Sequence, residues 1–313
     1  MRAPFPWFGG KSRAASLIWS YLGDVANYVE PFAGSLAVLL GRPHRAHTET
    51  VNDADCYVVN FWRAVSADPV AVAQWADWPV SEADQNARHV WLMGRAEFRE
   101  RMNSDPGYYD AKIAGWWVWG QNIWIGTGWC DSRWYFDVEG DAGTGIHRQL
   151  PNLGNGGMGI NRKLPHLGDA GTGIAEWLIS LQKRLRRVRI ACGDWSRVVT
   201  PSVTTKHGLT GILLDPPYAT ENEGSYAVND QVAVQVAQWA RENGDNPLLR
   251  IALCGYQGEH DLPGWEVAEW GQRKGYQKTA NDGTHSGHLE RIWFSPHCLK
   301  ATRQVCMFEE ALA

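Results

Sequence analysis

The chain has 313 residues, of which 44% are hydrophobic and 20% charged, and its formal net charge is -4 at pH 7. This composition is ordinary for a folded globular protein; it excludes a disordered chain and argues weakly against indiscriminate nucleic-acid binding. No run of about 18 apolar residues occurs and the N-terminus has no apolar signal segment, so we expect no membrane partner and a cytoplasmic location.

The cysteines show neither a C-x-x-C pair nor a cluster with histidine at the spacing of metal ligands. We therefore expect no disulfide framework and no bound metal, and we interpret the thiols as reduced and mostly structural. They are Cys56, Cys130, Cys192, Cys254, Cys298 and Cys306.

The N-terminal segment 5–11 is a glycine turn that leads into an amphipathic helix, for which Ser12 is the expected N-cap. The turn contains Trp7, Gly10 and Lys11. A lysine at a helix entrance either binds a carboxylate or phosphate or is simply solvated, and both readings stay open here.

Residues 27–40 predict a strand, a tight loop and a helix, which is the shape of a cofactor loop. The loop lacks the glycine patterns of dinucleotide and nucleoside-triphosphate sites. A second strand ends at Asp53, 19 positions after Gly34. Nucleoside-binding α/β folds place the acid that binds the ribose hydroxyls at this position, so Asp53 is our candidate and Asp55 the alternative. A strand-ending aspartate is also common as a turn residue or helix cap.

Between about residues 85 and 175 the alternation of strands and helices is lost. A helical stretch near 88–102 precedes a tryptophan-rich segment, which indicates either core packing or a stacking surface. A glycine-rich repeat with a period of 14 follows at 140–174. Its basic residues, Arg148, Arg162 and Lys163, would contact DNA phosphates or base edges, unless the repeat is a passive insertion that grew by duplication.

Regular structure returns after residue 175. We expect a helix at 176–187, a strand at 188–192 that leads to Asp194, and a buried strand at 211–214. A helix at 231–241 and strands at 248–254 and 289–294 follow. A basic loop between the last two strands contains further candidates for DNA binding, Arg273 and Lys274.

The tetrapeptide Asp215-Pro216-Pro217-Tyr218 directly follows the buried strand, where ligands of open α/β sheets bind. An exocyclic amine of a nucleobase is a poor nucleophile, and acceptors that hold both of its hydrogens favour a tetrahedral nitrogen. The Asp215 carboxylate and the Pro216 carbonyl would accept these hydrogens, because successive prolines fix the backbone and remove competing donors. The Tyr218 ring would stack on a base flipped out of its duplex. The tetrapeptide therefore predicts an amine-methylating site, the alternative being a proline turn after a strand.

These segments occur in the same order as in the Dam-type (D12 class) DNA adenine methyltransferases, and together they resemble that family. The matching segments are Trp7-Phe8-Gly9-Gly10-Lys11, Glu30-Pro31-Phe32-Ala33-Gly34-Ser35, Asn52-Asp53, Gly193-Asp194-Trp195, Asp215-Pro216-Pro217-Tyr218 and Glu290-Arg291-Ile292-Trp293-Phe294.

The resemblance implies an α/β protein with a Rossmann-like methyltransferase sheet. Residues 1–84 and 175–313 would form the domain that binds S-adenosylmethionine, and 85–174 an inserted, irregular Trp- and Gly-rich target-recognition domain. The implied cofactor-binding residues are Trp7, Gly10, Lys11, Glu30, Phe32, Gly34, Asp53, Asp194 and Asp215, and the implied catalytic residues are Asp215, Pro216, Pro217 and Tyr218.

The implied partner is double-stranded DNA, in a bacterial cell or a phage-infected host, and the implied reaction is direct methyl transfer to N6 of a flipped adenine, with S-adenosylhomocysteine as product. The insertion does not match the family's reader of GATC, so that specificity is not carried over. Because the chain shows no endonuclease segment, it would be either an orphan enzyme, as in phages and prophages, or one part of a restriction-modification system. Methylation of cytosine N4 or RNA adenine, and nucleic-acid binding without turnover, are the alternatives.

Overall fold

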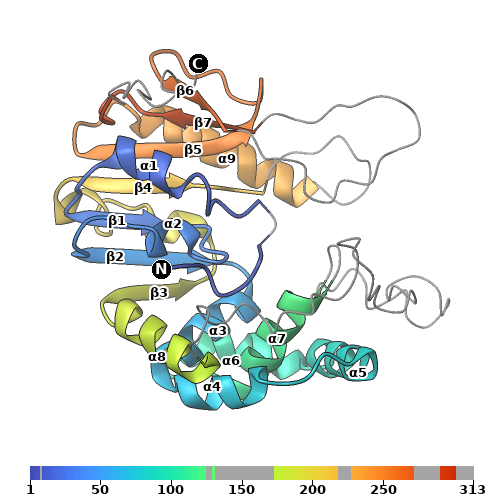
Figure 1. The fold of residues 1–313 in the computed structure, drawn as a ribbon. Coiled ribbons are helices and arrows are strands. Elements are labelled where there is room, and N and C mark those ends of the chain that lie inside the picture. Colours follow the sequence, from blue (N-terminus) through green and yellow to red (C-terminus); the bar gives the residue numbers. More distant parts are fainter. Residues whose placement is uncertain (8, 125–128, 131–172, 218–226, 271–289, 301–313) are drawn as a thin grey trace, which may run out of the picture. The chain divides into compact units, whose positions relative to one another are not determined.

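The computed structural model describes residues 1–7, 9–124, 129–130, 173–217, 227–270 and 290–300 (Figure 1). The chain divides into two compact units. Unit 1 comprises Met1–Ser12, Glu30–Gly41 and Thr48–Thr200, and unit 2 comprises Arg13–Val29, Arg42–His47 and Pro201–Ala313. Both units contain helices and strands, and the strands pair mostly in parallel, which confirms the predicted Rossmann-like α/β class.

The strands of unit 1, β2 (Thr48–Asp53) and β3 (Val188–Cys192), pair in parallel with Asp53 opposite Cys192. The four inner residues of β2 are buried, whereas every residue of β3 is at least partly exposed. Because parallel strands end at the same edge, the residues that follow β2 and β3 emerge together. This edge carries most of the candidate residues.

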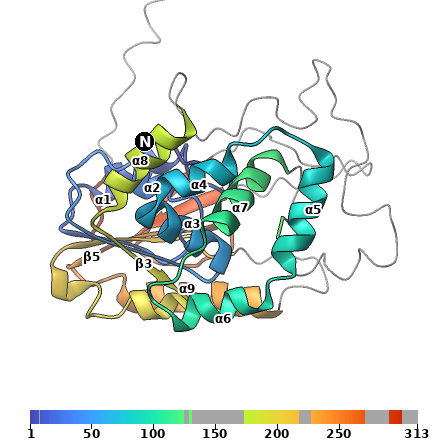
Figure 2. The same ribbon diagram turned by 90° about the horizontal axis from the view of Figure 1, so that it is seen from below.

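Helices of unit 1 pack against each other and against these strands. Their bounds are α2 (Ala37–Leu40), α3 (Cys56–Ala67), α4 (Pro69–Ala76), α5 (Glu82–Met93), α6 (Ala96–Ser104), α7 (Ala111–Ile123), α8 (Ile174–Leu185) and the short 3-10 helix η3 (Trp195–Val198). Helix α3 contacts β2 and β3 on one side and α4, α7 and α8 on the other. Figure 2 shows α3, α4 and α7 side by side.

Side chains at the helix ends explain several of these boundaries. Asp55, Asp68, Ser81 and Asp110 each accept a backbone N–H hydrogen bond as the N-cap of α3, α4, α5 and α7. The single helical stretch expected near 88–102 is two helices, α5 and α6, interrupted at Gly94 and Arg95.

An aromatic core holds the helices of unit 1 together. Phe5 packs edge-to-face against Phe61 and Trp117, at ring-centroid distances of 5.4 and 5.0 Å. Trp62, Trp117 and Trp119 are almost completely buried. Full burial of an indole removes a large apolar area from water, so these residues are a major source of stability. Core packing is thus the role of the tryptophans at 117 and 119.

A buried ion pair ties α8 to β2. The Arg184 guanidinium donates two hydrogen bonds to the Glu49 carboxylate, with N···O distances of 2.6 and 2.9 Å, and a third to the carbonyl of Leu39. The Glu49 side chain is fully buried. A bidentate arrangement compensates for the loss of water around both charges.

The strands of unit 2 follow the order β1-β4-β5-β7-β6. Their bounds are β1 (Asn27–Glu30, whose last residue is assigned to unit 1), β4 (Thr210–Leu214), β5 (Leu249–Tyr256), β6 (Glu266–Glu269) and β7 (Glu290–Phe294), and the unit's helices are α1 (Ala15–Leu22), η4 (Thr205–His207) and α9 (Ala227–Asn243). Strands β1, β4 and β5 are parallel, and β7 is antiparallel to β5 and β6. All five residues of β4 are buried, as the apolar run predicts.

Helices α1 and α9 both contact β5. The Tyr21 ring of α1 stacks on Phe294 with centroids 3.8 Å apart, and Arg250 of β5 donates to the carbonyl of Leu22 at 2.6 Å. Helix α1 begins at Ala15 with Ala14 as its N-cap residue, so the expectation that Ser12 caps it is wrong. No helix in the described part of the chain is both long and apolar enough to span a membrane.

Candidate cofactor site

Asp53 joins the ends of two structural elements in unit 1. Its Oδ2 atom accepts a hydrogen bond from the backbone N–H of Gly34, and its Oδ1 atom accepts one from the N–H of Asp55, each at 2.9 Å. The carboxylate at the end of β2 therefore holds residues 31–36, the loop between β1 and α2 that contains Gly34 and is called the glycine loop below. It also holds the turn that links β2 to α3.

The environment of Asp53 changes its acidity. Burial, followed by the charge of Asp55, raises the pKa of this carboxyl from its ordinary value to about 6. Backbone N–H groups of Asp55, Gly34 and Ala54 act in the opposite direction, because they stabilise the ionised form. Displaced pKa values of this kind are common in functional sites.

The neighbouring Asn52 connects three segments of this edge. Its Nδ2 atom donates to the backbone carbonyls of Pro31 and Gly193, at 3.0 and 2.9 Å. The backbone carbonyl of Asn52 accepts a hydrogen bond from the N–H of Ala33 at 2.8 Å. The N–H of Gly193 also donates to the carbonyl of Asp53 at 2.9 Å. The loops after β1, β2 and β3 are therefore fixed relative to one another by hydrogen bonds.

Gly34 permits a close approach of Trp7. Its φ angle is +45°, and a Cβ atom built on it would lie 2.5 Å from Nε1 of Trp7, so no other residue fits without strain. The carbonyl of Gly34 accepts a 3.0 Å hydrogen bond from Nε1 of the buried Trp62. Leu36 completes the tight turn with a φ of 55°, which is unusual for a residue other than glycine.

Lys11 is a buried cation in the N-terminal segment. It is only 3% exposed, and its Nζ atom donates to the carbonyl of Gly9 at 2.6 Å. Gly9 has a φ of 72°, and Gly10 donates its N–H to the carbonyl of Trp7 at 2.9 Å. The glycine turn thus holds the ammonium group inside the unit; of the two readings left open for Lys11, the solvated one does not hold.

Asp194 follows β3 at the same edge. Its Oδ1 atom accepts the N–H and the hydroxyl of Ser196, so the side chain caps η3 while remaining exposed. The adjacent Trp195 is buried, and its ring lies 6.2 Å from that of Phe32 with an interplanar angle of 28°. An acid and two nearly parallel aromatic rings are therefore neighbours.

Unit 2 contains the described part of the Asp-Pro-Pro-Tyr segment. Asp215 directly follows β4 and is half-buried, Pro216 is buried and Pro217 is exposed. Strand β4 runs parallel to β1, with Ile212 opposite Val29, so the two strands lead to one edge of their sheet. The position of Asp215 at a carboxyl strand end agrees with the sequence analysis.

Unit 1 brings together most of the predicted cofactor residues. They are Trp7, Gly10, Lys11, Glu30, Phe32, Gly34, Asp53 and Asp194. Tyr218 and the predicted DNA-binding residues Arg148, Arg162, Lys163, Arg273 and Lys274 lie outside the described residues. Within the described ranges, no three His, Cys, Asp or Glu side chains gather as metal ligands.

Asn52 and Trp62 were not predicted as site residues, although both hold the glycine loop through side-chain donors. An amide directly before a strand-ending acid was the available signal for Asn52. Trp62 lies in helix α3, 28 residues from Gly34, and no sequence pattern around it indicated a contact with the glycine loop.

Part of the chain matches the model of a known protein family. Residues 7–115, about a third of the chain, match the family model of the D12 class N6 adenine-specific DNA methyltransferases. The matched region includes Trp7, Lys11, the glycine loop and Asp53, and it ends before Asp194 and Asp215. No protein with a curated function matches the chain in sequence.

Proposed function

We propose that this chain moves a methyl group from S-adenosylmethionine to N6 of an adenine flipped out of double-stranded DNA. The match of residues 7–115 to the family model of the D12 class N6 adenine-specific DNA methyltransferases supports this proposal. The observation that carries the proposal is the network of Asp53, Gly34 and Asn52 at the carboxyl edge of β2.

The residues of unit 1 fit a nucleoside with a positively charged sulfonium. A carboxylate offers about four acceptor positions, more than the backbone N–H groups around Asp53 fill. Asp53 would hold ribose hydroxyls with the remaining capacity. Phe32, Trp195 and Asp194 offer aromatic faces and an acceptor suited to the adenine ring and its amine.

S-adenosylmethionine supplies an electrophilic methyl group when it is bound. Asp215 and the carbonyl of Pro216 would accept the two hydrogens of the target amine and direct its lone pair toward that methyl group. The buried Pro216 and the exposed Pro217 have no N–H to compete for those acceptors. We assign Asp215 to holding the amine and leave the departing proton to water, because the amine becomes acidic only as the methyl bond forms.

The test is transfer of label from methyl-labelled S-adenosylmethionine to unmethylated duplex DNA, single-stranded DNA and RNA in parallel reactions. We expect label in duplex DNA. Label only in RNA would overturn the proposed substrate. Tight DNA binding with no label in any nucleic acid and no cofactor binding would favour a binding protein without turnover.

A further inference from the structure

Two cysteine side chains meet beside the proposed cofactor edge. The Sγ atom of Cys56 lies 3.8 Å from the Sγ atom of Cys192, although the two residues are 136 positions apart. Cys56 is the first residue of α3 and is buried, and Cys192 is the last residue of β3 and is half-buried. Both are free thiols. Because a disulfide bond is about 2.05 Å long, joining them requires the sulfurs to approach by roughly 1.7 Å.

The surroundings favour a thiolate on Cys56. The contact with Cys192 lowers the pKa of the Cys56 thiol to about 7, while burial and the charge of Asp55 oppose this effect. The charges of Arg99 and Arg63 contribute to the lowering, after the contact with Cys192. The contact with Cys56, followed by the burial of Cys192 itself, raises the pKa of the Cys192 thiol. Cys56 also lies at the N-terminus of helix α3, where negative charge is stabilised, so the lowered pKa agrees with its position.

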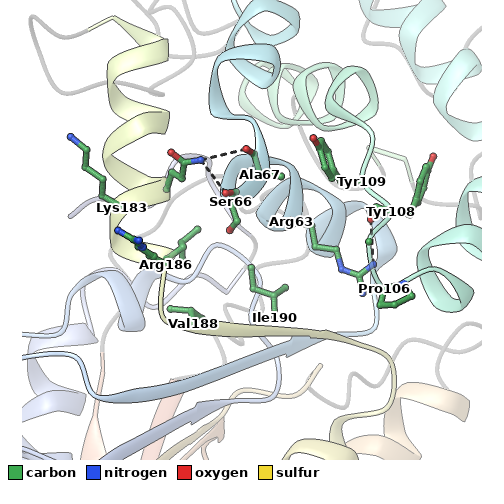
Figure 3. Close-up of a pocket in the computed structure, with 13 residues that line it drawn as sticks. Arg63, Ser66, Ala67, Pro106, Tyr108, Tyr109, Lys183, Arg186, Val188 and Ile190 are labelled. Carbon is green, nitrogen blue, oxygen red and sulfur yellow. Dashed lines mark hydrogen bonds between the residues drawn. The ribbon is translucent and has the colours of Figure 1, made fainter.

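A cavity of about 630 Å³ lies along the same two elements (Figure 3). Val188 and Ile190 of β3 and Arg63 and Ser66 of α3 form part of its lining. Cys192 follows Ile190 by two positions and therefore projects from the same face of the strand. Arg63, which donates to the carbonyls of Met102 and Tyr108, brings a positive charge to this space. The cavity therefore lies on the face of β3 from which Cys192 projects, and its lining ends at Ile190, two positions before Cys192.

The pair is also linked to the residues of the proposed cofactor site. Cys192 is the strand partner of Asp53, and the next residue, Gly193, donates its N–H to the carbonyl of Asp53. On the other side, Cys56 follows Asp55, whose N–H binds the Asp53 carboxylate. Each cysteine is therefore adjacent in sequence to a residue whose backbone N–H binds Asp53.

We propose that Cys56 and Cys192 form a reversible, redox-sensitive pair that a hydroperoxide converts to a disulfide, and that the disulfide weakens cofactor binding at Asp53. The Cys56 thiolate attacks one oxygen of hydrogen peroxide and becomes a sulfenic acid as hydroxide leaves. The Cys192 sulfur then attacks the sulfenic sulfur, so that the S–S bond forms and the S–O bond breaks. Two thiols and one peroxide give one disulfide and two waters, and a dithiol reductant reverses the step.

The test exposes the whole purified protein to hydrogen peroxide, blocks the remaining thiols under denaturing conditions and identifies cross-linked peptides by mass spectrometry. We expect a cross-link between Cys56 and Cys192 that a dithiol reductant removes. Recovery of both cysteines as separately blocked thiols, under conditions that oxidise a free small-molecule thiol, would overturn the proposal.

Two variants sharpen this result. In Cys192→Ser, which keeps a hydroxyl donor beside the Cys56 sulfur, the cross-link is lost and Cys56 accumulates as a sulfenic acid that a dimedone probe traps. In the matched control Cys254→Ala, which removes a buried thiol of β5 in unit 2, the cross-link forms as in the parent protein. Equal dimedone labelling of Cys56 in the parent and in Cys192→Ser would contradict a resolving role for Cys192.

The effect on the cofactor rests on the proposed function and is measured separately. We expect oxidation to weaken binding of S-adenosylhomocysteine about tenfold or more, the factor expected when a hydrogen bond to a charged group is displaced, and Cys192→Ser to abolish this loss. A cross-link with unchanged affinity would overturn the link between the pair and the site. Failure of the reduced protein to bind S-adenosylhomocysteine would instead count against the proposed function, while the cross-linking result would stand by itself.

Discussion

The backbone N–H of Gly34 donates a 2.9 Å hydrogen bond to Oδ2 of Asp53. This bond joins the glycine loop after β1 to the carboxyl end of β2. In the proposed function it places a backbone turn and a ribose-binding carboxylate in a fixed relation before the cofactor arrives. Such preorganisation reduces the cost of ordering a binding site.

Asp53→Asn tests the carboxylate. An amide has one oxygen acceptor, so its NH2 group must face the N–H of either Gly34 or Asp55. We expect a loss of about 1–3 kcal/mol in unfolding free energy, measured by denaturant titration, and at least about tenfold weaker binding of S-adenosylhomocysteine, measured by calorimetry. Asp55→Asn is the matched control, because asparagine remains a good N-cap for α3. Equal losses in the two variants would contradict the role of Asp53.

The raised pKa of Asp53 predicts how folding depends on pH. Because the folded-state pKa is about 6 and the unfolded value is lower, this group contributes stability that is fully present below the unfolded pKa and is lost as the pH rises through about 6. The unfolding free energy of the parent protein should therefore fall, relative to that of Asp53→Asn, between about pH 4 and pH 6. Parallel stability curves would exclude a raised pKa.

The same ionisation predicts how cofactor binding depends on pH. If the charged carboxylate accepts the ribose hydroxyls, affinity for S-adenosylhomocysteine should rise with pH and level off above the pKa of about 6. Asp55→Asn should move this profile to lower pH, because it removes a charge that raises the Asp53 pKa. An unchanged profile in that variant would show that another group controls the pH dependence.

Gly34→Ala tests the close approach of Trp7. The new Cβ would meet the indole at 2.5 Å on a backbone with a φ of +45°, so we expect a loss of about 1–3 kcal/mol in stability and impaired cofactor binding. Gly173→Ala is a suitable control, since a Cβ there meets no atom of the described residues within 4 Å. Thermal unfolding of both variants provides the comparison, and normal stability of Gly34→Ala would show that the loop adjusts freely.

Asp215→Ala tests the proposed hold on the target amine. We expect turnover to fall by about two orders of magnitude or more, as when a charge-stabilising group of an active site is removed. The measurement is single-turnover methyl transfer, with circular dichroism to confirm folding. Near-normal turnover in the folded variant would remove Asp215 from the mechanism.

The repeat at 140–174 yields a prediction from sequence alone. Neutralising Arg148, Arg162 and Lys163 together should weaken DNA binding and reduce the slope of its affinity against salt concentration, because fewer counterions are released. Binding titrations at several salt concentrations measure that slope. If it does not change, the repeat is a passive insertion.

Local patterns in the sequence predicted the strands that position the site. Strand β3 has the predicted bounds, and β4 begins one residue before the predicted strand at 211–214, because apolar runs bounded by polar turns are strong strand signals. The exposed strand β6, with glutamates at both ends, was not predicted, since its pairing with β7 rather than its own composition makes it a strand.

Contacts between distant parts of the chain could not be predicted in this way. The acid Asp53 was found through its spacing from Gly34, which is a local pattern. The meeting of Cys56 with Cys192 depends instead on the parallel pairing of β2 with β3 and on the packing of α3, neither of which has a signature in the residues themselves. Scattered cysteines therefore predicted only structural thiols.

The most direct test of the central claim is the identity of the methylated nucleoside. Duplex DNA labelled by the enzyme from methyl-labelled S-adenosylmethionine is digested to nucleosides, which are separated and identified by mass. We predict N6-methyladenine, with the label greatly reduced when Asp215→Ala replaces the parent enzyme. N4-methylcytosine, or label that persists in Asp215→Ala, would contradict it.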